Sequence, residues 1–134
     1  MKLLLDTHVW VWALLEPSRL SPRVRKLIED RKTERWLSAI SVWEVALLID
    51  AGRLAGEGSA KAWVESTARA LPVRDAPVDR EVAMVSRTLV LPHQDPADRF
   101  IVATASIMGL TLVTADRHLL RTGACEVLSA STRS

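Results

Sequence analysis

The sequence predicts an α/β fold in which helices cover both faces of a parallel sheet. Short apolar segments of strand length alternate along the chain with longer helical segments, many of which stop at proline or glycine. The clearest apolar segments lack alternating polar residues, which is typical of strands buried on both faces. Parallel neighbours need crossover connections, and the helices between the strands supply them.

The first elements follow from the punctuation of the N-terminal region. Residues 2–6 form a short apolar strand. A helix follows at once and continues to about Leu15, before Pro17 stops it. Ser21-Pro22 is a favourable start for a second helix, because proline fits the first helical position. We expect that helix to continue to about Lys32.

The middle of the chain continues the alternation. Residues 35–40 form the second strand, and Ser41 begins a helix that ends near Gly52, since glycine accepts the left-handed cap conformation. Residues 59–71 form an amphipathic helix. Residues 73–78 form a short strand, and the proline within it indicates the edge of the sheet.

The last third of the chain adds two helices and two strands, with a short helix between the strands. Residues 79–90 are helical, and the next helix begins at Asp95-Pro96 and ends at a glycine before the buried strand 111–115. Residues 116–121 form the short helix, and residues 125–129 form the last strand.

Length and composition fit one domain, residues 1–134, with one core. Hydrophobic residues make up 49% of the chain and charged residues 25%, which excludes a disordered protein. The single cysteine, Cys125, cannot form an internal disulfide, and no Cys/His spacing indicates zinc. No segment approaches the ~20 apolar residues of a membrane span. We expect an unprocessed cytoplasmic protein.

The charge distribution permits a nucleic-acid partner without requiring one. The net charge is +2 and the isoelectric point about 9.1, and basic side chains gather between Arg19 and Arg35. Such a run could attract a phosphate backbone. Glu29, Asp30 and Glu34 dilute it, so a solvated helix face is the simpler explanation.

Four acidic residues stand where an apolar strand gives way to a helix or in the first turns of an apolar helix: Asp6, Glu44, Asp98 and Asp116. Each alone is explained by helix capping. Ser41 and Glu44 have the spacing of a capping box, and Asp98 lies in the first turn after the cap residue Asp95. Capping explains any one of these acids, but it does not explain why all four junctions carry one. In a parallel sheet these junctions meet at the carboxyl edge, where ligands bind.

Four carboxylates at one edge repel one another unless their pKa values rise or a divalent cation binds between them. Oxygen ligands suit Mg²⁺ or Mn²⁺. Two such ions can activate a water, hold a phosphate and stabilise the leaving oxygen, so the acids indicate phosphodiester hydrolysis. Thr114 adds a hydroxyl on the strand that leads to Asp116.

The acids belong to four longer segments spread over nearly the whole chain. These are Leu3-Leu4-Leu5-Asp6-Thr7-His8-Val9, Ser41-Val42-Trp43-Glu44-Val45-Ala46, His93-Gln94-Asp95-Pro96-Ala97-Asp98-Arg99-Phe100-Ile101-Val102-Ala103-Thr104-Ala105 and Leu112-Val113-Thr114-Ala115-Asp116. Together they resemble the PIN-domain nucleases, and within them the VapC-like toxins of bacterial toxin–antitoxin pairs.

The resemblance implies a three-layer α/β/α PIN-like fold whose parallel sheet has four or five strands in the order 3-2-1-4-5. It implies a toxin that is a Mg²⁺- or Mn²⁺-dependent ribonuclease, with an RNA substrate, a cognate antitoxin and a homodimer. The implied catalytic and metal-binding acids are Asp6, Glu44, Asp98 and Asp116. Thr114 is the implied neighbouring hydroxyl, and Asp95 an accessory acid.

Other residues give weaker indications. Arg99, Arg117 and His118 adjoin the predicted site and are candidates for contacts with RNA phosphates. The sequence does not interleave aromatic and basic residues, so it does not predict a base-stacking surface. Trp10 and Trp12 help to make the first helix apolar nearly all round, so it is either wedged in the core or offers a face to a partner.

Two other classes of function stay open at this stage. A Rossmann-like phosphoryl-transfer protein also places an aspartate after its first strand. However, a phosphatase would carry a second aspartate where His8 stands, and a receiver domain a lysine near Thr114. The other class is a binding module that uses the acids only as helix caps.

Overall fold

A single parallel sheet organises the molecule. The computed structural model describes residues 1–54, 59–91 and 95–131. In these residues the sheet has the strand order β3-β2-β1-β4-β5. The strands are β1 (Lys2–Leu5), β2 (Glu34–Ser38), β3 (Arg74–Ala76), β4 (Thr111–Thr114) and β5 (Val127–Ser129). The predicted fold class and the implied strand order are both confirmed, and β3 lies at an edge as expected.

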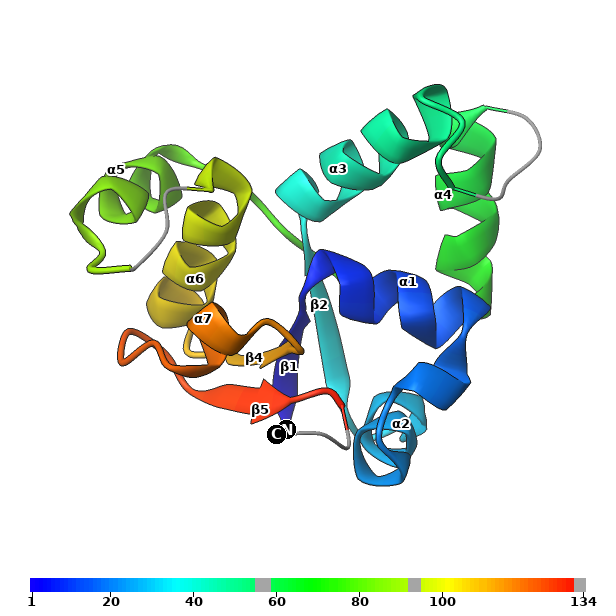
Figure 1. Ribbon diagram of the computed structural model, residues 1–134, viewed down its shortest axis with the longest axis horizontal. Coiled ribbons are helices and arrows are strands. Elements are labelled where there is room, and N and C mark those ends of the chain that lie inside the picture. Colours follow the sequence, from blue (N-terminus) through cyan, green and yellow to red (C-terminus); the bar gives the residue numbers. More distant parts are fainter. Residues whose placement is uncertain (55–58, 92–94, 132–134) are drawn as a thin grey trace.

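Helices cover both faces of this sheet, as Figure 1 shows. They are α1 (Thr7–Leu15), the short 3₁₀ helix η1 (Pro17–Arg19), α2 (Pro22–Glu29), α3 (Ala39–Asp50), α4 (Ala60–Ala70), α5 (Arg80–Thr88), α6 (Pro96–Met108) and α7 (Arg117–Leu120). Gly109, in the left-handed conformation at φ 65°, ends α6 as the sequence predicted. Of the helices in the described ranges, none is long and apolar enough to cross a membrane.

The alternation of side chains along β1 divides the core into two layers. Leu3 and Leu5 pack with residues of α1, α2, α3 and α4 on one face of the sheet. Leu4 packs with residues of α6 and α7 on the other face. All three leucines are fully buried, because β1 lies in the middle of the sheet with a helical layer on either side. This burial explains why the strand is apolar from Leu3 to Leu5.

Helix starts differ from the prediction at one point that bears on the site. The helix after β2 begins at Ala39 instead of Ser41, since the Ser38 hydroxyl accepts a hydrogen bond from the Ile40 amide at 3.1 Å. Ser41 is fully buried inside α3. The interpretation of Ser41 and Glu44 as a capping box was therefore wrong.

The second helix is also shorter than predicted and ends at Glu29 instead of about Lys32. The Asp30 carboxylate accepts a hydrogen bond from the Lys32 amide at 2.8 Å, which offers the backbone a turn in place of a further helical turn.

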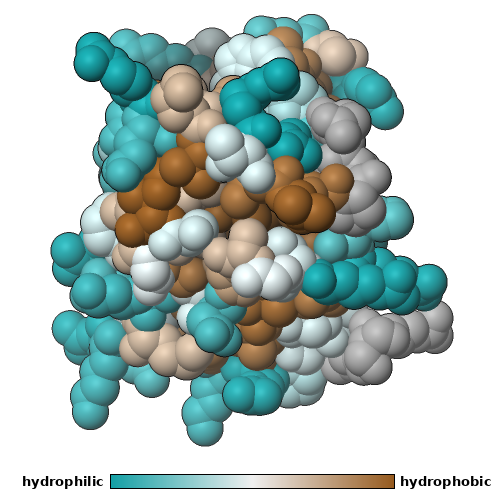
Figure 2. Space-filling view, turned by 90° about the vertical axis from the view of Figure 1, so that its left-hand side faces the viewer, coloured by the Kyte–Doolittle hydropathy of each residue, from teal (hydrophilic) through white to brown (hydrophobic). Residues whose placement is uncertain are grey.

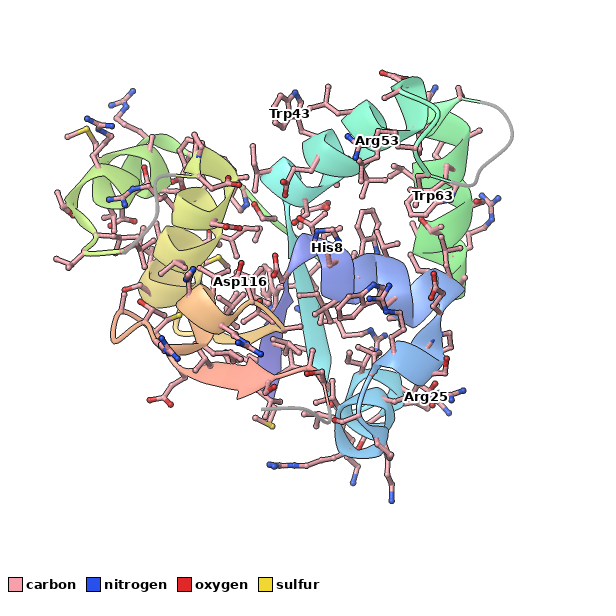
Figure 3. All side chains as sticks on the ribbon, in the orientation of Figure 1. His8, Arg25, Trp43, Arg53, Trp63 and Asp116 are labelled. Carbon is pink, nitrogen blue, oxygen red and sulfur yellow. The ribbon has the colours of Figure 1, made fainter. Side chains whose placement is uncertain are left out.

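Apolar side chains remain exposed on the outer helices. Met84 on α5 is 66% exposed and Val90, after that helix, is 94% exposed. Figure 2 shows the side of the molecule that carries α5 and α6, where apolar residues gather in a band bordered by polar ones. Trp43 and Leu47, four residues apart on α3, are 57% and 49% exposed. In Figure 3, Trp43 points away from the body of the molecule.

Candidate active site

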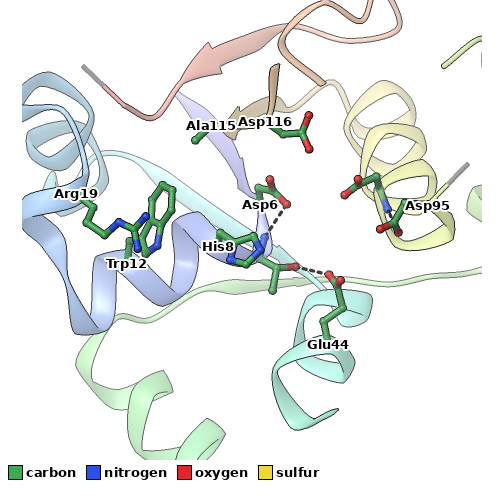
Figure 4. A pocket seen from close by; sticks show the side chains of 10 residues that line it. Asp6, His8, Trp12, Arg19, Glu44, Asp95, Ala115 and Asp116 are labelled. Atoms are coloured by element: carbon green, nitrogen blue, oxygen red, sulfur yellow. Dashed lines mark hydrogen bonds between the residues drawn. The ribbon is translucent and has the colours of Figure 1, made fainter. Parts of the chain in front are cut away.

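A cavity of about 490 Å³ lies at the carboxyl edge of the sheet. Residues from the two ends of the chain meet there, and Figure 3 shows His8 and Asp116 both near the middle of the molecule. The cavity is lined by Asp6, Thr7, His8, Trp12, Arg19, Glu44, Asp95, Asp98, Ala115 and Asp116 (Figure 4). The structure thus brings the four predicted acids together around one space, with Asp95 beside them.

Asp6 is the most enclosed of these acids, with 7% of its surface exposed. It follows β1 directly, and one carboxylate oxygen accepts a hydrogen bond from the Thr7 amide at 2.8 Å, which caps α1. The other oxygen accepts a hydrogen bond from the Thr114 hydroxyl at 2.6 Å. Both oxygens are therefore held in place, one by the start of α1 and the other by the end of β4.

Glu44 projects from α3 and is held by α1. Its Oε1 lies 2.6 Å from the Thr7 hydroxyl oxygen, which also lies 2.8 Å from the Ser41 hydroxyl oxygen. A hydroxyl carries one proton and an ionised carboxylate can only accept, so Thr7 donates to Glu44 and the Ser41 hydroxyl donates to Thr7. This chain of hydrogen bonds explains why Ser41 and Thr7 are buried although they are polar.

Asp116 and Thr114 form the β4 side of the site. The Asp116 carboxylate caps α7 by accepting hydrogen bonds from the His118 amide at 2.7 Å and the Leu119 amide at 3.3 Å. The Asp116 amide donates to the Thr114 hydroxyl oxygen at 3.1 Å. Since the same hydroxyl donates to Asp6, Thr114 connects the two acids that follow the neighbouring strands β1 and β4.

Asp95 and Asp98 occupy the start of α6. Asp95 is the cap, and its Oδ1 accepts hydrogen bonds from the amides of Ala97 at 2.9 Å and Asp98 at 3.4 Å. Asp98 lies in the first helical turn and is half-buried. The capping role predicted for Asp95 is confirmed.

Three of these carboxylates, on Asp98, Asp6 and Glu44, have raised pKa values. The pKa of Asp98 is raised to about 7, first by burial and then by the negative charges of Asp6, Asp95, Asp116 and Glu44. Burial also raises the pKa of Asp6, although the hydrogen bonds from Thr114 and Thr7 oppose the shift. The pKa of Glu44 is raised by burial and lowered in part by its bond from Thr7.

The donor chemistry of the cavity fits a hard divalent cation. The acids offer oxygen ligands and no thiolate, and a cation between them would relieve the repulsion that raises the pKa of Asp98. In the part of the chain that the structure describes, no three His, Cys, Asp or Glu side chains stand close enough to hold one ion together. The acids surround a shared space and do not form a closed cage.

The three predicted phosphate contacts lie outside this lining. Arg99 is half-buried, and its guanidinium donates to the carbonyl oxygens of Ser86 at 2.9 Å and Leu89 at 2.6 Å, which ties α6 to the end of α5. Arg117 and His118 are exposed on α7, after Asp116. A contact with RNA phosphate stays a prediction for all three. For Arg99 the structure supplies a structural role.

Sequence reasoning did not assign five of the lining residues to the site: Thr7, His8, Trp12, Arg19 and Ala115. The spacing of His8 and Trp12, four positions apart on one helix, was a signal that both lie on one face. The proline at position 17 was the signal that the chain turns sharply before Arg19. The contacts of Trp12 with His8 and Arg19 bring one aromatic and one basic side chain into the site, which the sequence did not predict.

The PIN-domain family model matches residues 3–124 of this chain. The chain belongs to the PIN-domain family. This membership decides against the phosphatase and receiver-domain alternatives that an aspartate after the first strand had left open. It also agrees with the resemblance found in the four segments that carry the acids.

Similar proteins extend this PIN-domain assignment over the whole fold. Ribonuclease VapC22 of Mycobacterium tuberculosis (strain ATCC 25618 / H37Rv) is 38% identical over 119 residues, which are 87% of this chain and 88% of that protein. A chain in the structure of VapBC2 from Rickettsia felis bound to a promoter DNA fragment has a TM-score of 0.74 at 13% identity, over 98% of this chain and 100% of that one. A chain of FitAcB from Neisseria gonorrhoeae has a TM-score of 0.59 at 26% identity, over 94% and 96%.

Proposed function

We propose that this PIN domain is a metal-dependent endoribonuclease and acts as the toxin of a toxin–antitoxin pair. The observation that carries the proposal is the meeting of Asp6, Glu44, Asp98 and Asp116 around one cavity at the sheet edge. The 38% identity to Ribonuclease VapC22 supports RNA as the substrate. The acids that cap helices also face one space, so a purely structural role for them explains less.

In this proposal the four acids hold Mg²⁺ or Mn²⁺, and Asp95 is an accessory acid at the rim of the cavity. When bound, these ions activate a water and offset the charge of the scissile phosphate. The chain itself fixes the ligands. Thr114 orients Asp6, and Thr7 orients Glu44, each through a hydrogen bond of 2.6 Å. Hydrogen-bonded partners of this kind keep metal ligands in position.

The proposed partners are an antitoxin and a second copy of the chain. The solved relatives include toxin–antitoxin complexes, and the structure from Rickettsia felis holds promoter DNA. The exposed Trp43 and Leu47 on α3 form an apolar surface that a second protomer would cover. A cytoplasmic location for such a pair stays our prediction.

Cleavage of RNA by the purified protein tests the enzymatic part of the proposal. We expect the wild-type protein to cleave single-stranded or structured RNA with Mg²⁺ or Mn²⁺, and to stop when EDTA removes the ions. Asp6→Asn should cleave at least about 10³-fold more slowly, because it removes a charged ligand while keeping the shape of the side chain. Equal activity of both preparations would point to a contaminating nuclease and contradict the assignment.

Expression in a bacterial host tests the toxin part. Induction of the wild-type chain should arrest growth, whereas Asp6→Asn should not. Co-expression of the reading frame next to this gene should relieve the arrest if that frame encodes the antitoxin. Growth arrest that is equal for both variants would separate toxicity from catalysis and contradict this part.

A further inference from the structure

One wall of the cavity carries no acid and is built from α1 and η1. The Arg19 guanidinium carbon lies 4.3 Å from the centre of the Trp12 ring, which places it over the indole face. The His8 ring lies 6.2 Å from the Trp12 ring and continues this wall toward Asp6 (Figure 4). Of the described residues that line the cavity, Arg19 alone carries a permanent positive charge.

The contact with Trp12 holds the Arg19 guanidinium over the ring face. Arginine commonly packs on aromatic faces, and a guanidinium has five N–H donors, so donors remain for a phosphate. The guanidinium also forms an ion pair with Glu16 at 4.0 Å, in which both side chains are more than half exposed. Such a pair is weak and readily exchanged for another anion.

The position of this cation matches what an RNA strand would need in the cavity. The acidic side of the cavity repels phosphates unless a cation is bound there, whereas Arg19 attracts them without one. Guanidinium groups bind phosphate oxygens through two parallel hydrogen bonds. A strand with its scissile phosphate at the acids would therefore find a second phosphate site on the α1 side.

We propose that Arg19, held in place by the Trp12 indole, binds a phosphate that flanks the scissile bond of a single-stranded RNA. The inference rests on the proposed function, since it assigns part of the substrate to that same cavity. Arg19 is the contact residue, and Trp12 is a positioning residue that acts through Arg19.

Binding measured without divalent ions tests the inference separately from catalysis. The probe is a fluorescein-labelled single-stranded RNA of mixed sequence in EDTA, and anisotropy gives the Kd at several salt concentrations. We expect Arg19→Ala to weaken binding about tenfold, as the loss of a charged hydrogen bond does. The slope of log K against log salt should become shallower by about 0.7, the value for one phosphate contact on a single strand. Arg23→Ala removes an exposed arginine nearby and is the matched control.

Conservative variants separate contact from positioning. Arg19→Lys keeps the charge, so it should retain the salt slope of the wild type with a smaller loss of affinity. Trp12→Phe should leave the slope unchanged and weaken binding only about two- to threefold, because the cation remains but is less firmly oriented. In cleavage assays with metal, Arg19→Ala should raise KM while kcat changes little.

The outcomes distinguish the two proposals. If Arg19→Ala binds RNA with the same affinity and salt slope as the wild type or as Arg23→Ala, the phosphate site is refuted, whether or not the protein cleaves RNA. A wild-type protein that binds no RNA in EDTA refutes it as well. Binding that depends on Arg19 in a protein without nuclease activity would uphold the phosphate site and overturn the proposed function.

Discussion

The two walls of the cavity are held by different means. On the acidic wall, Asp6, Glu44 and Asp116 are fixed by backbone amides and threonine hydroxyls at distances between 2.6 and 3.3 Å. On the opposite wall, Trp12 and Arg19 hold each other through a stacked contact, and Arg19 stays more than half exposed. Chemistry requires fixed ligands, whereas a binding contact tolerates adjustment. The difference agrees with our two proposals, in which the acidic wall carries out the cleavage and the opposite wall binds the substrate.

The largest expected effect is on the acidic wall. Asp116→Asn should lower RNA cleavage at least about 10³-fold, because a neutral amide is a poor cation ligand. The fold should be retained, since asparagine caps a helix as well as aspartate does. Initial rates and the midpoint of thermal unfolding measure the two effects.

Asp79→Asn is the matched control for this variant. Asp79 caps α5 by accepting a hydrogen bond from the Val82 amide at 2.9 Å, and it does not line the cavity. Its substitution should leave cleavage unchanged. If both variants lose activity equally, the acids of the cavity act only through the fold, and the difference between the two walls disappears.

A smaller effect is expected for the residue that supports two acids. Thr114→Val removes the hydroxyl that donates to Asp6 and accepts from the Asp116 amide. Loss of such a supporting group should reduce cleavage about 10- to 100-fold and stability by about 1–3 kcal/mol. Thr104→Val is the control, because Thr104 is a buried threonine on α6 whose hydroxyl donates to the Phe100 carbonyl of the same helix at 2.7 Å. Equal loss of activity in the control would show that Thr114 has no specific role.

The pH dependence of stability reports the crowding of the acidic wall. The pKa of Asp98 is about 7 in the folded chain and near 3.8 when unfolded, so between these values the folded state binds more protons. In EDTA, stability should therefore fall as the pH rises from about 4 to 7. Asp98→Asn should reduce this fall by about 1–2 kcal/mol, after allowance for solvent screening of a half-exposed group.

Urea unfolding at several pH values measures this effect. The buried Asp6 and the half-buried Glu44 have pKa shifts in the same direction, so part of the slope should remain in the variant. Adding Mg²⁺ or Mn²⁺ at pH 8 should raise the unfolding midpoint of the wild type more than that of Asp98→Asn. A wild-type stability that rises between pH 4 and 7 would contradict the crowding of these acids.

The smallest expected effect belongs to the opposite wall. Arg19→Ala should cost less than about 1 kcal/mol of stability, because a stacked cation at an exposed position contributes little. Arg99→Ala should cost more, about 1.5–3 kcal/mol, since it removes charged hydrogen bonds to the carbonyls of Ser86 and Leu89. The free energy of unfolding in urea measures both losses. Equal losses for the two variants would contradict this expectation and show that Arg19 has a structural role like that of Arg99.

The sequence predicted the elements that depend on local rules. Apolar runs indicated the strands, and Asp95-Pro96 and Gly109 marked both ends of α6 correctly. The start of α3 was wrong because serines at 38 and 41 compete for the cap, and only the depth of burial decides between them. Ser41 is needed inside, against Thr7, which no local pattern reveals.

The sequence predicted the acids of the site but did not predict the wall opposite them. Asp6 and Asp116 follow strands and Asp98 lies in the first turn of α6, so the parallel topology brings them to one edge, whereas Glu44 reaches the same cavity from the second turn of α3. Trp12 and Arg19 come from separate helices, and their contact depends on the turn that η1 makes. The first helix is apolar nearly all round, so its sequence does not show that the face with Trp12 lines the cavity.

The hydrogen bond from Thr114 to Asp6 joins residues 108 positions apart. On the ribosome, β1 is synthesised long before β4, and the Asp6 amide gains its partner, the Val113 carbonyl, only when β4 has emerged. Until then the cavity lacks Asp116 and the support of Asp6. A nascent chain is therefore without its complete set of acids until residues 111–116 have emerged, and the site forms only after that point.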